Sequence, residues 1–246
     1  MTPSPQHGTP AGDATIAIRK LARQGGGDVQ ELMVLYALEG LLARVALSEY
    51  RDDFVLKGGV LLAAFAARRP TRDIDFQAMR LDGDPIWPEP QLIELPRVLD
   101  LGFMPVVLLG YPLTMVLAEK IVTAVDRGVA NTRWRDFADV YTITRLHAVG
   151  ADELRASLVT VAEYRRVTLR PMLPALSMMG EMAQEKYRAW RTRSNREDEL
   201  PAEFESLLAT VASFSDPVGR RGRPVHGAAF RRSGGWDPIP LCSSRR

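Results

Sequence analysis

Asp73 and Asp75 are two aspartates separated by one residue, and their type and spacing suit the binding of a metal ion. On a β-strand successive side chains alternate between the two faces, so both carboxylates would point to one side while Ile74 and Phe76 would point into the core. Mg²⁺ accepts such a pair of carboxylates when the phosphates of a substrate complete its coordination shell. The Asp-x-Asp sequence therefore predicts a metal site on a strand.

A glycine pair, Gly58-Gly59, precedes this strand and could form the other half of such a site. The apolar run 54–56 predicts a buried strand that ends at the glycines, and the run 60–67 predicts a helix after them. Glycine N–H groups can approach a phosphate closely, and the N-terminus of a helix adds a favourable positive potential. The four features together indicate a site for a phosphorylated substrate and a metal ion.

Each of these short motifs also has a purely structural interpretation. A lone Asp-x-Asp is most often part of a solvated edge strand, and two glycines after a strand usually form only a turn. The order in which the motifs follow one another along the chain is more specific than any one of them.

Composition narrows the class of protein. The chain has 246 residues, of which 46% are hydrophobic. Its single cysteine, Cys242, excludes an intrachain disulfide and a cysteine-based metal site. No stretch approaches the ~20 apolar residues of a membrane span, and the first residues lack the order of a signal peptide. We therefore expect a cytoplasmic protein with no membrane contact.

The formal net charge of +2 is too small to indicate nucleic-acid binding by itself. Arginines nevertheless gather in several short segments, namely 68–72, 126–137, 163–170, 186–196 and the C-terminal tail. These segments could form a basic face for a nucleic acid, or they could be ordinary solvated helix faces.

The segment from Lys57 to Phe76, with KGGVLL and then RRPTRDIDF, resembles the nucleotidyltransferase superfamily. Within this superfamily, the sequence from roughly Asp28 to Pro217 is similar to the AbiEii/MenT-type toxins of type IV toxin–antitoxin systems. The resemblance implies an enzyme that transfers a nucleotide from an NTP to the 3′ end of tRNA, which would block aminoacylation and translation. It also implies a cognate antitoxin encoded beside the toxin.

The resemblance assigns roles to individual residues. Asp73 and Asp75 would bind Mg²⁺ or Mn²⁺, and Lys120 and Asp136 would join them as catalytic residues. A larger set would hold the nucleotide: Lys57, Gly58, Gly59, Arg69, Thr71 and Lys120.

Lys120 and Asp136 each also have a purely structural interpretation. From the sequence alone, Glu119-Lys120 is most simply a solvated ion pair on a helix, and Asp136 is most simply a helix N-cap. Asp139 is the second candidate for the acidic role that the resemblance gives to Asp136.

The chain departs from the family pattern after Phe76. The resemblance implies a longer segment there, with extra strands and a third acidic residue, before a turn like Gly83-Asp84-Pro85. Asp82 or Asp84 could replace the third carboxylate, or both could be ordinary turn residues. The alternative function is therefore a catalytically impaired relative that binds nucleotide, RNA or an antitoxin without turnover.

The order of the elements predicts an α+β protein with a small mixed sheet followed by helices. Asp28 is expected to cap a helix with an apolar stripe, and Pro112 to lie in the first turn of a helix that ends at Gly128. We expect a disordered N-terminus at 1–13, a nucleotidyltransferase-like domain at 14–149, a helical C-terminal domain at 150–215 and a disordered basic tail at 216–246.

Overall fold

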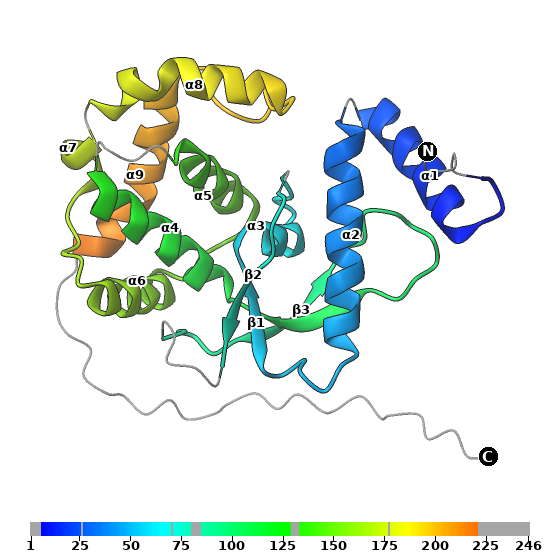
Figure 1. Cartoon of the computed structure of the whole chain (residues 1–246). Coiled ribbons are helices and arrows are strands. Elements are labelled where there is room, and N and C mark those ends of the chain that lie inside the picture. Colours follow the sequence, from blue (N-terminus) through cyan, green and yellow to red (C-terminus); the bar gives the residue numbers. More distant parts are fainter. Residues whose placement is uncertain are drawn as a thin grey trace.

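The computed structural model describes residues 6–25, 27–69, 71–79, 85–128, 133–176 and 178–220. The elements, in chain order, are α1 (Pro10–Gly25), α2 (Val29–Ala46), β1 (Phe54–Lys57), α3 (Gly58–Leu61), the 3₁₀-helix η1 (Leu62–Phe65), β2 (Asp75–Ala78), β3 (Gln91–Leu95), β4 (Val106–Gly110), α4 (Leu113–Arg127), α5 (Trp134–Leu146), α6 (Ala151–Arg165), α7 (Met172–Leu176), α8 (Met179–Arg193) and α9 (Phe204–Arg220). In Figure 1, α1 and α2 lie on one side of the molecule and the helices from α4 to α9 on the other.

The four strands form one mixed sheet. In the described part of the chain its order is β2-β1-β4-β3. Strand β1 pairs antiparallel with β2 and parallel with β4, and β3 pairs antiparallel with β4. The expected α+β class, with a mixed sheet and a helical C-terminal region, is confirmed.

The alternation expected around the two aspartates is present. Asp73 and Asp75 are exposed, whereas Ile74 and Phe76 are partly buried and pack against the core. Strand β2 begins at Asp75, so Asp73 precedes the strand and does not belong to it. Lys57 lies opposite Asp75 in the β1–β2 register, and residues directly opposite each other share a face of the sheet.

One hydrophobic core joins the sheet to the C-terminal helices. The main cluster of buried side chains runs from Leu42 in α2 to Ala212 in α9. Phe137 of α5 and Phe204 of α9 meet edge to face, with ring centroids 5.6 Å apart. The domain boundary at Val149 stays a prediction.

Helix α2 has the predicted cap and an unpredicted buried charge. The side chain of Asp28 accepts a hydrogen bond from the N–H of Gln30 at 2.9 Å, as an N-cap does. Glu39 is buried within the apolar stripe, where its carboxylate accepts from the N–H of Val98 at 2.8 Å and pairs with Arg68 at 3.2 Å. This carboxylate ties α2 to the segment that follows β3.

The N-terminal helix begins earlier than expected. Residues 10–13 were predicted to be disordered, but α1 starts at Pro10. The hydroxyl oxygen of Thr9 accepts from the N–H of Gly12 at 3.1 Å, and Pro10 occupies the first helical position, where its missing N–H costs nothing. Residues 1–5 lie outside the described part of the chain.

The last helix also extends beyond its predicted end. Disorder was expected from Asp216 onward, but α9 continues to Arg220. The Asp216 carboxylate accepts from the N–H of Met172 at 2.8 Å, which anchors this turn to α7. The remaining tail, 221–246, lies outside the described residues.

The helix after the glycine pair starts at Gly58 and not at Val60, and it tightens into η1. It ends at Ala66, whose φ of +53° lies in the left-handed region, with the N–H of Ala67 donating to the carbonyl of Leu62 at 2.9 Å. Across the residues that the structure describes, no helix is both long and apolar enough to cross a membrane.

Candidate active site

The glycine pair lies directly against the segment that carries the two aspartates. Gly58 has a φ of +71°, and a Cβ atom added there would lie 1.9 Å from Oδ2 of Asp75. A Cβ atom on Gly59 would lie 2.7 Å from Oγ1 of Thr71. Both glycines are therefore needed for this close approach, which brings the turn and the acidic segment together.

Replacing Gly58 with alanine should lower the free energy of unfolding by at least about 2 kcal/mol, because the new Cβ meets Asp75 and the backbone is left-handed. Urea unfolding of the variant measures this loss. Gly25→Ala is the matched control, since no atom lies within 4 Å of a Cβ there, and it should change stability by less than about 0.5 kcal/mol. Parental stability for Gly58→Ala would contradict the geometry of the turn.

The two aspartates form an exposed acidic pair. The hydroxyl of Thr71, a buried residue, donates to Oδ1 of Asp73 at 2.8 Å and fixes that carboxylate. Among the described residues, no group of three or more His, Cys, Asp and Glu side chains is placed to hold a metal ion. Two carboxylates still suit Mg²⁺, which usually keeps several waters and takes further oxygens from substrate phosphates.

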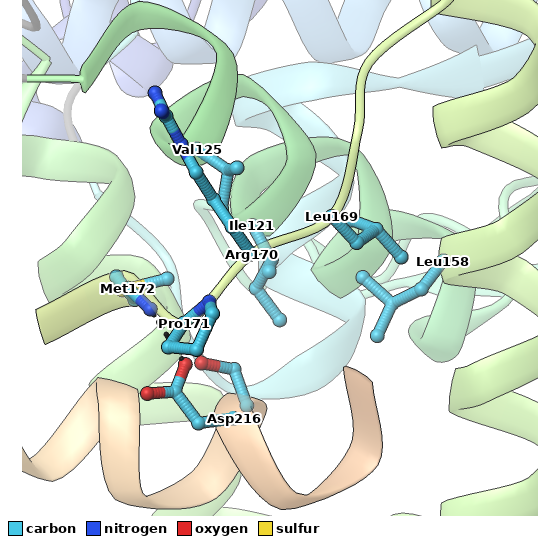
Figure 2. Close-up of a pocket in the computed structure, with 9 residues that line it drawn as sticks. Ile121, Val125, Leu158, Leu169, Arg170, Pro171, Met172 and Asp216 are labelled. Atoms are coloured by element: carbon cyan, nitrogen blue, oxygen red, sulfur yellow. Dashed lines mark hydrogen bonds between the residues drawn. The ribbon is translucent and has the colours of Figure 1, made fainter. Parts of the chain in front are cut away.

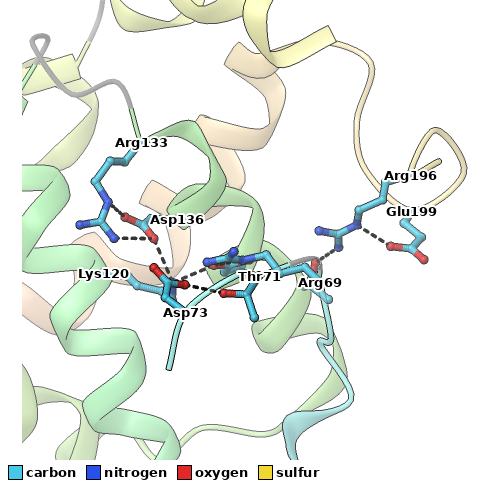
Figure 3. A network of polar contacts seen from close by, with 10 residues as sticks. Arg69, Thr71, Asp73, Lys120, Arg133, Asp136, Arg196 and Glu199 are labelled. Carbon is cyan, nitrogen blue, oxygen red and sulfur yellow. Dashed lines mark hydrogen bonds and ion pairs between the residues drawn. The ribbon is translucent and has the colours of Figure 1, made fainter. Parts of the chain in front are cut away.

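Lys120 is held by two carboxylates and is not solvated (Figure 3). Its side chain is 11% exposed, and its Nζ donates to Oδ1 of Asp136 at 2.9 Å and to Oδ2 of Asp139 at 2.7 Å. The alternative of a solvated Glu–Lys pair is therefore wrong. Burial by itself lowers the pKa of Lys120, but the carboxylates of Asp139 and Asp136 more than offset this and raise the pKa above its ordinary value.

Asp136 lies in the first turn of α5, which begins at Trp134, so the interpretation of Asp136 as an N-cap is wrong. Its side chain is buried and points to Lys120. Arg133 approaches from the other side, with Nε 2.6 Å from Oδ2 in an ion pair. Nη2 of Arg133 also donates to Oδ1 at 3.4 Å, whereas Oδ2 has no hydrogen-bond donor in the described part of the chain.

Asp139 lies one helical turn further along α5 and holds a second cation. Its side chain is 1% exposed, and both of its oxygens accept from Nε of Arg69 at 3.1 Å. Arg69 belongs to the segment between η1 and β2, and a Cβ on Gly59 would lie 3.6 Å from its Nη1. Asp139 therefore connects Lys120 of α4 with an arginine beside the glycine turn.

A pocket of about 120 Å³ opens beside these groups. Arg165 of α6, from the arginine-rich segment 163–170, reaches its wall and donates to Oγ1 of Thr123 at 2.8 Å and to Oε1 of Glu119 at 3.1 Å. Lys57 pairs with the same Oε1 at 3.8 Å. The pocket is lined by Gly58, Tyr111, Val116, Glu119, Lys120, Thr123, Arg133, Asp136 and Arg165.

The structure brings most of the predicted site residues into one neighbourhood. Gly58, Lys120 and Asp136 line the pocket, and the remaining residues adjoin it through the contacts described above. Asp82 and Asp84, the candidates for a third carboxylate, lie outside the described residues. The arrangement joins an exposed acidic pair to a pocket lined by Lys120, Arg133 and Arg165.

A second cavity, of about 260 Å³, lies on the opposite face of α4 (Figure 2). Ile121 and Val125 line it, whereas Lys120 and Thr123 line the first pocket, and the 3.6-residue helical repeat places these pairs on different faces. Its other walls contain both apolar and polar side chains and come from α6, α9 and the segment around Pro171. Ser215 also lines this cavity, and its buried hydroxyl has no hydrogen-bond partner among the residues described.

Ser215→Ala should therefore raise the free energy of unfolding by about 1 kcal/mol, because it removes a buried hydroxyl without a partner. Ser157→Ala is the control and should lower it by about 1 kcal/mol, since the Ser157 hydroxyl donates to the carbonyl of Trp87 at 2.6 Å. Urea unfolding compares the two variants with the parent. A stability loss for Ser215→Ala as large as that for Ser157→Ala would show that the Ser215 hydroxyl has a partner after all.

Comparison with known families identifies the family of the chain. A family model described as nucleotidyl transferase AbiEii toxin, type IV TA system, matches residues 40–84 and 77–213. The two matched segments overlap at 77–84, next to the point after Phe76 where the sequence departs from the family pattern. No curated protein matches the chain. Because the matched segments cover more than half of its length, the chain belongs to the AbiEii nucleotidyltransferase toxin family of type IV toxin–antitoxin systems.

Proposed function

We propose that this protein transfers a nucleotide from an NTP to the 3′ end of tRNA in a reaction that depends on Mg²⁺ or Mn²⁺. The observation that carries the proposal is the placement of Asp73 and Asp75 across the glycine turn from the pocket that holds Lys120. A metal–triphosphate complex needs carboxylates on the metal side and cations on the phosphate side. The choice of nucleotidyl transfer follows the family, and the choice of the tRNA 3′ end follows the resemblance of the motifs.

The metal would bind between Asp73 and Asp75. Both side chains are exposed, and Asp73 is oriented by Thr71. A divalent ion bound there supplies positive charge that neutralises the phosphates and favours departure of pyrophosphate. The carboxylates contribute its protein ligands, and their exposure leaves the other coordination positions to water and substrate.

The phosphates would lie between the glycine turn and Lys120. Gly58 presents no side chain, so the backbone can come close to a phosphate oxygen. Lys120 supplies a charged donor from α4, and Arg133 and Arg165 add positive charge at the wall of the pocket. Charge-assisted hydrogen bonds of this kind are stronger than neutral ones, so the set favours a polyphosphate.

Asp136 would act on the acceptor. Asp136 lines the pocket, and its buried Oδ2 has no hydrogen-bond donor among the described residues, although Nε of Arg133 lies 2.6 Å away. A buried acceptor in that state is suited to a hydroxyl group, such as the attacking hydroxyl of an RNA 3′ end. Its role is then to orient that hydroxyl and to accept its proton.

The partners of the protein follow from this function and from the family. A toxin of a type IV system is paired with an antitoxin, so a cognate antitoxin is the expected protein partner. NTP and tRNA would be its substrates. We place the protein in the cytoplasm, where both substrates occur.

A second candidate function is nucleotide or RNA binding without turnover. Two observations favour it. The first is that, within the described residues, Asp73 and Asp75 belong to no group of three or more His, Cys, Asp and Glu side chains that could hold a metal ion. The second is the position of β2 at the edge of the sheet, where β1 is its only neighbouring strand in the described part of the chain. A catalytic segment supported on one side is less well preorganised.

The deciding experiment incubates the purified protein with each of the four NTPs, labelled in turn, in the presence of Mg²⁺ and total tRNA. The proposal expects label in tRNA from at least one NTP and none after addition of EDTA. Retention of an NTP on the protein, with no label in any RNA, would favour the alternative of binding without turnover.

A further inference from the structure

We propose that Asp139 is a positioning residue that holds Lys120 and Arg69 side by side, so that both present their charge to a polyphosphate while Asp139 itself stays out of contact with the substrate. This inference rests on the proposed function and adds to it. It separates the roles of two aspartates that lie one helical turn apart and that sequence motifs treat alike.

Asp139 lies between two cations and contacts both of them. Its oxygens contact two cations that come from other parts of the fold, Nζ of Lys120 at 2.7 Å and Nε of Arg69 at 3.1 Å. Its own side chain is 1% exposed, whereas those of Lys120 and Arg69 are 11% and 15% exposed. A substrate can therefore reach the two cations more readily than the carboxylate between them.

Asp136 differs from Asp139 in its surroundings. Asp136 lines the pocket, but Asp139 is not among the residues of the pocket wall. An ammonium group has three N–H donors, and in the described part of the chain two of those of Lys120 are used, one by each aspartate. The third donor is left for a phosphate oxygen, and its direction is set by the other two.

Asp139 also prevents repulsion between the cations. Lys120 is faced by Asp136 and Asp139 from α5 and by Arg69 from the segment before β2. Arg69 and burial both lower the pKa of Lys120, and the two aspartates raise it. If Asp139 were uncharged, Asp136 alone would have to offset the effects of burial and of Arg69 on Lys120. Lys120 and Arg69 would then both be held less firmly.

The test uses Asp139→Asn, which keeps the size of the side chain and removes its charge. The chain has only four lysines, Lys20, Lys57, Lys120 and Lys186, so NMR of protein labelled at lysine Cε gives few resonances to titrate. Disappearance of one resonance in Lys120→Arg identifies Lys120. In the Asn variant, Lys120 should titrate at lower pH than in the parent, and affinity for the preferred NTP with Mg²⁺ should fall about tenfold or more.

Two further variants sharpen the result. Asp126→Asn makes the same change at an exposed position of α4 and should leave both the Lys120 titration and NTP affinity at parental values. Arg69→Gln removes the cation that lowers the pKa of Lys120, so Lys120 should titrate at higher pH while NTP affinity falls. The opposite directions of the two titration shifts distinguish positioning by charge from a general loss of structure, and Arg69→Gln keeps the test available if Asp139→Asn does not fold.

Unchanged NTP affinity in folded Asp139→Asn or in Arg69→Gln would overturn the positioning role. An unchanged Lys120 titration in Asp139→Asn would overturn it as well. Failure of the parent itself to bind any NTP is a separate result, because it contradicts the proposed function while the Lys120 titration still reports on the contact.

Discussion

Asp75→Ala and Asp73→Ala should each lower the rate of nucleotide transfer by about 10³-fold or more, because a metal ligand accounts for several kcal/mol of charge stabilisation. Stability should change little. Asp75 is exposed, so its loss opens no cavity and should cost less than about 0.5 kcal/mol. Asp73→Ala also removes the hydrogen bond from Thr71 and should cost about 1 kcal/mol.

Single-turnover transfer of label to tRNA measures the rate, and urea unfolding measures the stability. Asp52→Ala is the matched control, since Asp52 is an exposed aspartate between α2 and β1 and outside the site, and it should retain the parental rate. Transfer by Asp75→Ala at the parental rate would show that the metal does not depend on this carboxylate.

Lys120→Ala should remove transfer and also destabilise the fold by about 3 to 5 kcal/mol. The sequence alone suggests a smaller effect on stability, because a lysine on a helix surface contributes little. In the structure, however, the Lys120 side chain is only 11% exposed, and its removal leaves the buried carboxylates of Asp136 and Asp139 with one fewer cation. Removing one partner of a buried ion pair costs this much because the remaining charge stays buried.

The stabilisation by Lys120 should disappear at high pH. Its pKa in the folded protein is raised above the ordinary 10.5, so the contribution is fully present below pH 10.5 and is lost as the pH rises through the folded-state pKa. Urea unfolding of the parent and of Lys120→Ala at pH 7, 9 and above 10.5 measures the difference. Lys186→Ala, at an exposed lysine, should match the parent throughout. A difference that grows with pH would contradict the ion-pair assignment.

The local features of the site were predictable from the sequence. Gly58 and Gly59 were expected to end a strand at a turn whose N–H groups can approach a phosphate, and Asp73 and Asp75 were expected to alternate with Ile74 and Phe76. The alternation is present although only Asp75 lies within β2. The structure contains both because each depends only on neighbouring residues. The cap of α2 by Asp28 belongs to the same class of local signals.

The long-range pairings were not predictable. Arg69 and Asp139 are 70 residues apart, and nothing in either segment indicates the other. The sequence also does not distinguish a buried lysine from a solvated one. Only the fold, which places the carboxylates of Asp136 and Asp139 beside Lys120, shows that this lysine is not solvated. Arg165 lies in an arginine-rich segment that the sequence singled out, but nothing in α6 indicates that this side chain reaches the pocket.

The start of α1 at Pro10 was missed although the sequence contains a local signal for it. Thr9-Pro10 is a favourable N-cap and first helical residue, but the surrounding glycine and proline residues favoured disorder. The absence of a third carboxylate after Phe76 was inferred from the family pattern. The structure does not test it, because residues 80–84 lie outside the described part of the chain.

The central claim is that the α-phosphorus of an NTP is transferred to RNA, and the position of the label tests it most directly. The parent protein is incubated with tRNA, Mg²⁺ and the preferred NTP, labelled either at the α-phosphate or at the γ-phosphate. Nucleotide transfer predicts label in tRNA from the α-labelled NTP alone, with the γ label released in pyrophosphate. Label in RNA or protein from the γ-labelled NTP would show phosphoryl transfer and contradict the account.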